Sequence, residues 1–201
     1  MVAASLLLVT ACTSDDPVQE REAVPGHDEL TAAIAEFGEP FYDFDELRAV
    51  MVADEADVVF EEYYETDEDA HWGMQSVTKS VIGTLVGIAV DEGLIGSIDD
   101  TVGEMLPRYA GVMSARTADI TISQLLTMTA GLPGGLDAAG PDFLRSEDWV
   151  RHIVTHPDLP PGQQFQYSDA SSHLLSAILS EATGEPALQY ARSRLFDPLG
   201  I

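Results

Sequence analysis

Cationic side chains are scarce in this chain of 201 residues. Nine Lys and Arg stand against 35 Asp and Glu, which gives a formal net charge of −26 at pH 7. Lys79 is the only lysine, and the other eight cations are arginines. This balance excludes a nucleic-acid-binding protein that relies on a basic face and makes a polybasic membrane contact untenable. The hydrophobic fraction of 45% excludes a collagen-like or wholly disordered chain.

Cysteine and long hydrophobic runs are also scarce. Cys12 is the only cysteine, so no disulfide framework can form within the chain. The apolar run at residues 1–11 is too short to span a bilayer, which needs about 20 apolar residues. Its length is typical of the apolar region of an export signal.

The residues around the lone cysteine predict a lipid anchor. Val9-Thr10-Ala11-Cys12 resembles a bacterial lipobox, in which the thiol carries a diacylglycerol. We therefore expect residues 1–12 to be a lipoprotein signal peptide ending at Cys12, with the protein exported to the cell envelope and anchored to the membrane. No Lys or Arg precedes the apolar run, so a start a few residues upstream is expected. The alternative is a buried or disordered free thiol.

Acidic side chains are concentrated near the N-terminus. Residues 13–70 hold 20 Asp and Glu and two Arg. Such a surplus is typical of a solvated, self-repelling surface. A calcium site is the alternative, but the segment has no EF-hand spacing with its central glycine. Residues 13–40 are expected to form an acidic linker and a short helix, and residues 41–201 a single partial domain.

Hydrophobic periodicity predicts a helix-rich chain with one hairpin. Two β-prone runs, residues 47–52 and 58–64, flank a polar turn and predict the hairpin. Residues 77–92 are apolar nearly all round and predict a buried helix. Further helices are expected at 28–37, 102–106, 121–128, 146–155 (with Ser146 as its N-cap), 170–183 and 186–196, with a Gly/Pro-rich loop at 131–141 and a turn at 160–162.

The motif Ser76-Val77-Thr78-Lys79 is the candidate catalytic motif. Residues three apart lie on one face of a helix, so the Ser76 hydroxyl is expected beside the Lys79 amine. A serine becomes a nucleophile when a neighbouring base takes its proton, and lysine can serve if burial and the helix N-terminus lower its pKa. The spacing alone is a weak signal. The signal is stronger here because the only lysine of the chain lies in a mostly apolar helix, where a lysine without a function is costly. The alternative is a lysine that merely extends its ammonium group to water.

Several stretches carry a family resemblance in the order in which they occur: 75–80, 87–94, 98–100, 122–133, 161–162, 165–169, 176–179, 183–184 and 195–201. They resemble the penicillin-recognising serine hydrolases, which include class C β-lactamases, D-alanyl-D-alanine carboxypeptidases, family VIII-type esterases and 6-aminohexanoate-dimer hydrolase relatives. The resemblance covers roughly residues 45–201 and implies the N-terminal portion of the family domain. It implies an α+β, β-lactamase/transpeptidase-like fold, with a helical region and an N-terminal hairpin of an antiparallel sheet whose remaining strands are missing.

The resemblance also assigns further site residues. Tyr167-Ser168-Asp169 occupies the place of the family's Tyr-x-Asn motif, so Tyr167 is implied as the proton relay and Asp169 as a substrate-binding residue. Asp169 departs from the motif, because a carboxylate only accepts hydrogen bonds and adds charge. It could instead pair with Lys79, which would keep the lysine charged and make it a worse base. The family's third motif, Lys-Thr-Gly or His-x-Gly, does not occur at the expected place in this chain.

Together these features predict a serine hydrolase that forms an acyl-enzyme on Ser76 with Lys79 as general base. The expected substrate is a small-molecule ester or amide, or a peptide-like substrate, in preference to a β-lactam because of Asp169. A β-lactamase or D-Ala-D-Ala carboxypeptidase, and a non-catalytic envelope lipoprotein or binding module, are the alternatives. No cofactor, metal or nucleic acid is expected, and the histidines are interpreted as structural or surface residues. The 201-residue chain alone is expected to be inactive and prone to aggregate, since its hairpin edges lack partners.

Overall fold

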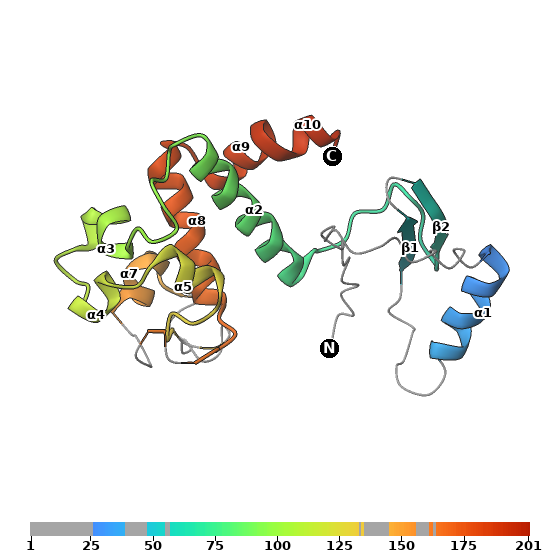
Figure 1. The fold of residues 1–201 in the computed structure, drawn as a ribbon, viewed down its shortest axis with the longest axis horizontal. Helices are drawn as coiled ribbons and strands as arrows, with labels where there is room; N and C mark the ends of the chain where they lie inside the picture. The colour runs from blue at the N-terminus through green and yellow to red at the C-terminus, as the bar shows by residue number, and fades with distance from the viewer. Residues whose placement is uncertain are drawn as a thin grey trace, which may run out of the picture. The chain divides into compact units, whose positions relative to one another are not determined.

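The computed structural model describes residues 26–38, 48–54, 57–132, 134, 145–155, 161–162 and 164–201 (Figure 1). The chain divides into two compact units, Met1–Gly73 and Met74–Ile201. The expected signal peptide, Cys12 and most of the acidic linker lie outside the described residues. In the part of the chain that is described, no helix is long and apolar enough to cross a membrane.

The first unit holds one helix and the predicted hairpin. Helix α1 spans His27–Gly38, and strands β1 (Ala49–Asp54) and β2 (Asp57–Tyr63) pair antiparallel, from Ala49 opposite Tyr63 to Asp54 opposite Asp57. The strands reach further into the predicted turn than expected, because Asp54 and Asp57 still pair. Among the residues of this unit whose burial is described, Phe60 of β2 is the buried side chain.

Helices are the main regular elements among the described residues of the second unit. A short 3₁₀ turn, η2, leads directly into the long helix α2, and a second long helix, α8, lies near the end of the chain (Figure 1). The elements are η2 (Gln75–Val77), α2 (Thr78–Asp91), α3 (Val102–Met105), η3 (Pro107–Tyr109), α4 (Ala115–Ala118), α5 (Ile122–Leu126), α7 (Trp149–Val154), α8 (Asp169–Thr183), α9 (Ala187–Ala191), the π-helix η4 (Arg192–Phe196) and α10 (Asp197–Leu199).

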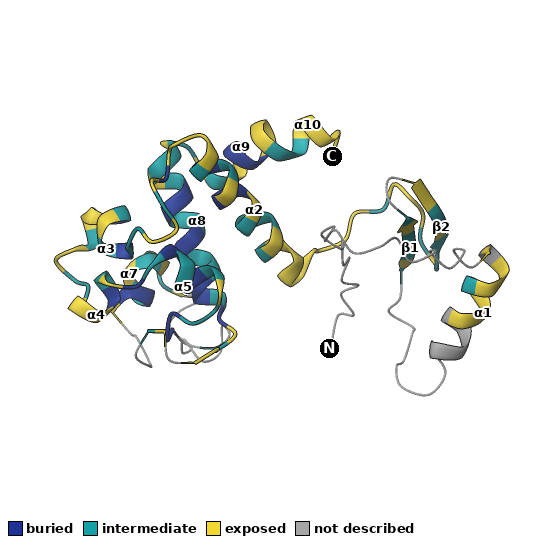
Figure 2. Ribbon diagram, viewed as in Figure 1, coloured by how far each residue is buried: buried dark blue, intermediate teal, exposed yellow. Residues whose placement is uncertain are grey.

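Helix α8 is the centre of the hydrophobic core of the second unit. Leu174, Leu175, Ile178 and Leu179 are buried at the i, i+1, i+4, i+5 spacing that aligns side chains on one helix face (Figure 2). Burial of each such side chain contributes about 1.5–3 kcal/mol to the hydrophobic free energy of folding. Helices α2, α5 and α7 pack against α8. This packing fixes the N-terminal ends of α2 and α8 relative to each other.

The helix predicted at residues 77–92 is present as α2, but the prediction that it is a buried helix is wrong for most of its length. Only Leu85, Val86 and Ala89 of α2 are buried, and Val77 at its start is exposed (Figure 2). The helix packs on α8 with one face, so the remaining apolar side chains are only partly covered by described residues. Near its C-terminal end, Glu92 accepts hydrogen bonds from the Tyr190 hydroxyl (3.0 Å) and from Arg194 Nε (2.6 Å).

Short helices in this unit begin at hydrogen-bonded caps. Thr101 and Thr121 each form a capping box, at the starts of α3 and α5, and their backbones meet in an isolated antiparallel bridge. Such caps satisfy N–H groups that a helix of four or five residues cannot pair internally. The prediction of Ser146 as the cap of its helix is wrong. Asp148 caps α7 by accepting from the Arg151 N–H at 2.9 Å, whereas the Ser146 hydroxyl donates to the Asp148 carbonyl.

Candidate active site

Ser76 lies in η2, immediately before α2, and Lys79 follows one helical turn later. The Lys79 Nζ donates a hydrogen bond to Ser76 Oγ at 3.1 Å. The predicted i, i+3 proximity is therefore present in the structure. Gln75, just before the serine, has φ of +46°, in the left-handed region that a non-glycine residue rarely adopts. This backbone conformation sets the direction from which the chain enters the turn that carries Ser76.

Tyr167 reaches Ser76 from 91 residues away in the chain. Its hydroxyl donates to Ser76 Oγ at 2.6 Å. The segment before α8 is tied to the end of α5 by two backbone hydrogen bonds, from the Gly162 N–H to the Thr129 carbonyl (2.7 Å) and from the Gln166 N–H to the Met128 carbonyl (2.8 Å). These bonds hold the backbone of Gln166, and with it the neighbouring Tyr167, against the helical core.

Gly134 allows another segment to pass close to the tyrosine backbone. A Cβ atom at Gly134 would lie 3.1 Å from the Tyr167 carbonyl oxygen and 3.2 Å from Gln166 Nε2. Both separations are tighter than ordinary van der Waals contact, so a side chain at position 134 would push on the segment that carries Tyr167. Sequence analysis did not single out Gly134. It lies in the predicted Gly/Pro-rich loop, and nothing in that composition distinguishes it from its neighbours.

Asp169 is the first residue of α8, and its carboxylate pairs with the catalytic lysine candidate. The Lys79 Nζ lies 2.5 Å from Asp169 Oδ1. Ser168 precedes it as the N-cap, accepting a hydrogen bond from the Ser171 N–H at 3.3 Å. The sequence suggests pairing with Lys79 as an alternative for Asp169, and the structure contains this pair.

The pKa values of Lys79 and Tyr167 are shifted in opposite directions. Burial works to lower the pKa of Lys79, but the hydrogen bonds and charges of Asp169 and Tyr167 outweigh it, so this pKa lies above its ordinary value. The pKa of Tyr167 is lowered, first by its hydrogen bond with Ser76 and then by the adjacent Lys79 ammonium. The Lys79 Nζ lies 4.9 Å from the centre of the Tyr167 ring. The geometry therefore favours a charged lysine beside a tyrosine that loses its proton more easily than usual.

His173 lies one turn after Asp169 on α8 and contacts a neighbouring helix. Its ring meets that of Trp149 edge to face, with centroids 4.8 Å apart. Burial lowers the pKa of His173 below its ordinary value, so the imidazole is neutral at neutral pH. This packing agrees with a structural role.

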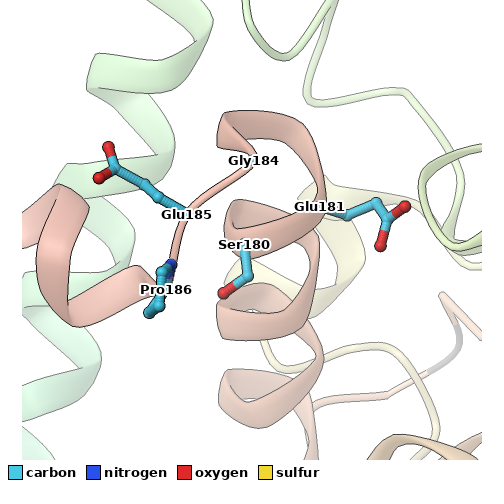
Figure 3. A pocket seen from close by; sticks show the side chains of 5 residues that line it. All are labelled: Ser180, Glu181, Gly184, Glu185 and Pro186. Atoms are coloured by element: carbon cyan, nitrogen blue, oxygen red, sulfur yellow. The ribbon is translucent and has the colours of Figure 1, made fainter.

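A shallow hollow lies at the C-terminal end of α8, the end opposite to Asp169. It is lined by Ser180, Glu181, Gly184, Glu185 and Pro186, which surround the chain reversal into α9 (Figure 3). The Ser180 hydroxyl already donates to the Ser176 carbonyl and accepts from the Ala187 N–H. The hollow is therefore formed by the chain connection between α8 and α9, and the hydroxyl of its serine is already hydrogen-bonded within that connection. Across the described parts of the chain, no three His, Cys, Asp or Glu side chains gather as a metal site would require.

The structure brings four of the five predicted site residues together. Ser76, Lys79, Tyr167 and Asp169 form one connected group at the converging N-terminal ends of α2 and α8. Cys12, the predicted lipidation site, lies outside the described residues. Gln75 and Gly134 are the positions that sequence reasoning missed.

Comparison with known proteins agrees with this arrangement. The Beta-lactamase family model matches residues 46–201. Penicillin-binding protein 4 of Amycolatopsis lactamdurans is 30% identical over 131 residues, which make up 63% of this chain and 33% of that protein. Protein flp of Staphylococcus aureus is 28% identical over 130 residues, 62% of this chain and 26% of that protein. The chain therefore spans about a quarter to a third of the length of these curated relatives.

Solved structures show the same fold. The D-stereospecific amidohydrolase from Streptomyces sp. matches with a TM-score of 0.60 at 25% identity, over 76% of this chain and 49% of that one. The octameric penicillin-binding protein homologue from Pyrococcus abyssi matches with a TM-score of 0.64 at 21% identity, over 86% and 43%, and this likeness concerns the fold alone. With a family match that covers most of its length and a β-lactamase/transpeptidase-like fold, the chain belongs to the β-lactamase family of serine hydrolases.

Proposed function

We propose that the full-length protein is a serine hydrolase that cleaves an ester or amide through an acyl-enzyme on Ser76. The observation that carries this proposal is the environment of the Ser76 hydroxyl, which lies 3.1 Å from Lys79 Nζ and 2.6 Å from the Tyr167 hydroxyl. A serine hydroxyl becomes a competent nucleophile when a neighbouring group takes its proton. Lys79 and Tyr167 are the two groups placed to move that proton.

The charge of Asp169 supports an uncharged ester or amide as the substrate. The Asp169 carboxylate neutralises Lys79, so the site offers a carboxylate-bearing substrate less attraction than an unpaired lysine would. Similarity to a D-stereospecific amidohydrolase supports amide cleavage in particular. Activity as a β-lactamase or D-Ala-D-Ala carboxypeptidase is the second candidate, favoured by similarity to a penicillin-binding protein.

Active-site labelling of the full-length protein tests this proposal. A fluorophosphonate probe forms a covalent bond with an activated serine, so we expect it to label the wild-type protein and not Ser76→Ala. Ser80→Ala is the matched control, because Ser80 is exposed on the same helix and only its backbone carbonyl has a described hydrogen bond. Faster labelling by fluorescent penicillin than by the fluorophosphonate would support the second candidate. A folded protein labelled by neither probe would contradict both and favour a non-catalytic binding module.

We also propose that the protein is exported and anchored to the membrane by a lipid on Cys12. The support is the short apolar run, the small residues before the cysteine and the polar tether after it. Two acyl chains on one cysteine anchor a protein firmly, since each buried CH₂ contributes about 0.8 kcal/mol.

A further inference from the structure

The ammonium of Lys79 is surrounded by groups that favour its charged form. Its Nζ contacts Ser76 Oγ at 3.1 Å, Asp169 Oδ1 at 2.5 Å and the face of the Tyr167 ring, with the ring centre at 4.9 Å. A protonated lysine has three donors and no lone pair, so it can bind all three neighbours at once. A neutral lysine would have to turn its lone pair toward Ser76 in order to take the serine proton, and it would leave the Asp169 carboxylate without its cation.

Asp169 is the first of the two groups, ahead of Tyr167, that offset the effect of burial on this lysine. The side chains of Lys79 and Asp169 are 19% and 26% exposed, so their interaction is partly shielded from water. Lys79 lies at the N-terminal end of α2, whose positive end disfavours a cation, and burial disfavours it as well. Asp169 lies at the N-terminal end of α8, where negative charge is favoured. Without its carboxylate, burial and the helix end would lower the pKa of Lys79 with less opposition.

No other charge near the lysine replaces this carboxylate within the described residues. The elements that pack against α2 are η2, α8 and η4. They bring Ser76 from η2 and His173 from α8, which is neutral at neutral pH. Arg194 of η4 pairs with Glu92 at the opposite end of α2.

We propose that Asp169 is a positioning residue that holds Lys79 as an ammonium throughout the working pH range, so that Tyr167 accepts the proton of Ser76. This inference rests on the proposed serine hydrolase function and refines it. Asp169 itself does not touch the reacting atoms in this scheme, because it acts through the charge of Lys79.

The proton transfers of the reaction then balance as follows. In the reactive form, Tyr167 is a phenolate beside the Lys79 ammonium. The Ser76 O–H bond breaks, its proton passes to the phenolate oxygen, and Oγ forms a bond to the substrate carbonyl carbon. When the tetrahedral intermediate collapses, the bond to the leaving oxygen or nitrogen breaks and Tyr167 returns the proton to it. Water then repeats the sequence on the acyl-enzyme, which releases the acid and restores Ser76.

The substitution Asp169→Asn removes the negative charge but keeps the size of the side chain. Loss of an adjacent anion stabilises every deprotonated state, so the pKa values of both Lys79 and Tyr167 fall. Since the reactive form is Lys79 ammonium with Tyr167 phenolate, activity begins when Tyr167 loses its proton and ends when Lys79 does. Both limbs of the pH profile of kcat/KM should therefore move to lower pH, by about one unit or more.

Lysine NMR on the full-length protein tests the proposal directly. In protein labelled with [ε-¹³C]lysine, the Lys79 signal is identified by its absence from Lys79→Arg. In the wild-type protein we expect this signal to keep its ammonium position across the acid limb of kcat/KM and to move only along the alkaline limb. In Asp169→Asn it should titrate at least about one pH unit lower, whereas Asp169→Glu, which keeps the charge, should stay nearer to wild type. Asp197→Asn is the matched control, because Asp197 also begins a helix but is exposed.

Two results would overturn the inference. One is a wild-type Lys79 that loses its proton along the acid limb, because Lys79 would then be the base. The other is a Lys79 titration that is the same in wild type and Asp169→Asn. The wild-type titration needs a substitution only to assign the Lys79 signal, so the test remains decisive if the Asp169 variants do not fold. Failure of the proposed function looks different: Ser76 would not react with any probe, while the lysine titration could still be measured.

Discussion

At the scale of single residues, the site depends on one serine hydroxyl that accepts hydrogen bonds from two proton carriers of different kinds. Lys79 comes from the same helical turn and Tyr167 from the segment before α8. The hydrogen bond from Tyr167 is the shorter of the two, and the tyrosine is also the more exposed partner. In the proposed mechanism, Tyr167 is therefore the partner that exchanges its proton with a bound substrate.

Removal of the tyrosine hydroxyl tests this arrangement. Tyr167→Phe keeps the ring beside Lys79 and removes the group that contacts Ser76 Oγ, so we expect kcat/KM of the full-length hydrolase to fall by roughly 10²–10⁴-fold. Ester hydrolysis measures the loss. Tyr63→Phe is the control, since the Tyr63 hydroxyl bonds Glu61 in the first unit and should leave the rate unchanged. A Tyr167→Phe variant with wild-type kcat/KM would remove Tyr167 from the mechanism.

The residues of the site differ in how far sequence could predict them. The proximity of Ser76 and Lys79 follows from helix geometry alone. Tyr167 was predicted only through the family resemblance, because no local rule links positions 91 residues apart. The positive φ of Gln75 and the close approach at Gly134 depend on tertiary contacts that leave no mark in composition.

At the scale of elements, two helix N-termini converge on the site and the core holds them there. The long helices α2 and α8 were predicted closely, because each is a long stretch rich in apolar residues that ends at or near a glycine, Gly93 and Gly184. The short elements η3, α4 and α10 were not predicted, since three or four residues contain too little pattern. The burial of α2 was overestimated, because apolar composition indicates which side chains can be buried. It does not indicate which neighbouring elements cover them.

Two glycine substitutions test separately how Tyr167 is positioned and how stable helix α2 is. In Gly134→Ala, the added Cβ lies 3.1 Å from the Tyr167 carbonyl oxygen, so we expect kcat/KM to fall by about tenfold to a hundredfold through displacement of Tyr167. In Gly87→Ala, on the exposed surface of α2, the Cβ meets nothing within 4 Å. This variant should keep its activity and gain about 1 kcal/mol in the free energy of unfolding. Chemical denaturation and ester hydrolysis of both variants check the expectation, which an unchanged kcat/KM in Gly134→Ala would contradict.

At the scale of the whole molecule, the chain combines a hairpin unit with a helical unit. The division into α-helices and a two-stranded antiparallel sheet agrees with the α+β class predicted from sequence. The strong acidity remains a property of composition, since 20 of the 35 acidic residues lie between residues 13 and 70 and many of these lie outside the described ranges. The sequence alone predicts this negative charge, but it does not predict which groups the acidic side chains lie against.

The lipid anchor is a prediction for the whole protein in its cell. In a bacterial host, the full-length wild-type protein should incorporate labelled palmitate and partition with the membrane fraction, because two acyl chains bind a bilayer firmly. Cys12→Ser cannot accept a diacylglycerol, so it should lose the label and leave the membrane fraction. Ser14→Ala, two residues beyond the cysteine, is the control and should behave as wild type. Equal palmitate incorporation in Cys12→Ser and wild type would show that Cys12 is not the lipidated residue.

The separation of Ser76 and Tyr167 along the chain has a consequence for synthesis. Ribosomes build the chain from the N-terminus, so Ser76 is made 91 residues before the tyrosine whose hydroxyl it contacts. Lys79 follows the serine almost at once, but Asp169 also comes only after Tyr167. Throughout that interval the nascent serine has neither its short hydrogen bond nor the carboxylate that fixes the charge of its lysine. The proposed nucleophile is therefore assembled late, and during synthesis its serine lacks the contacts that would activate it.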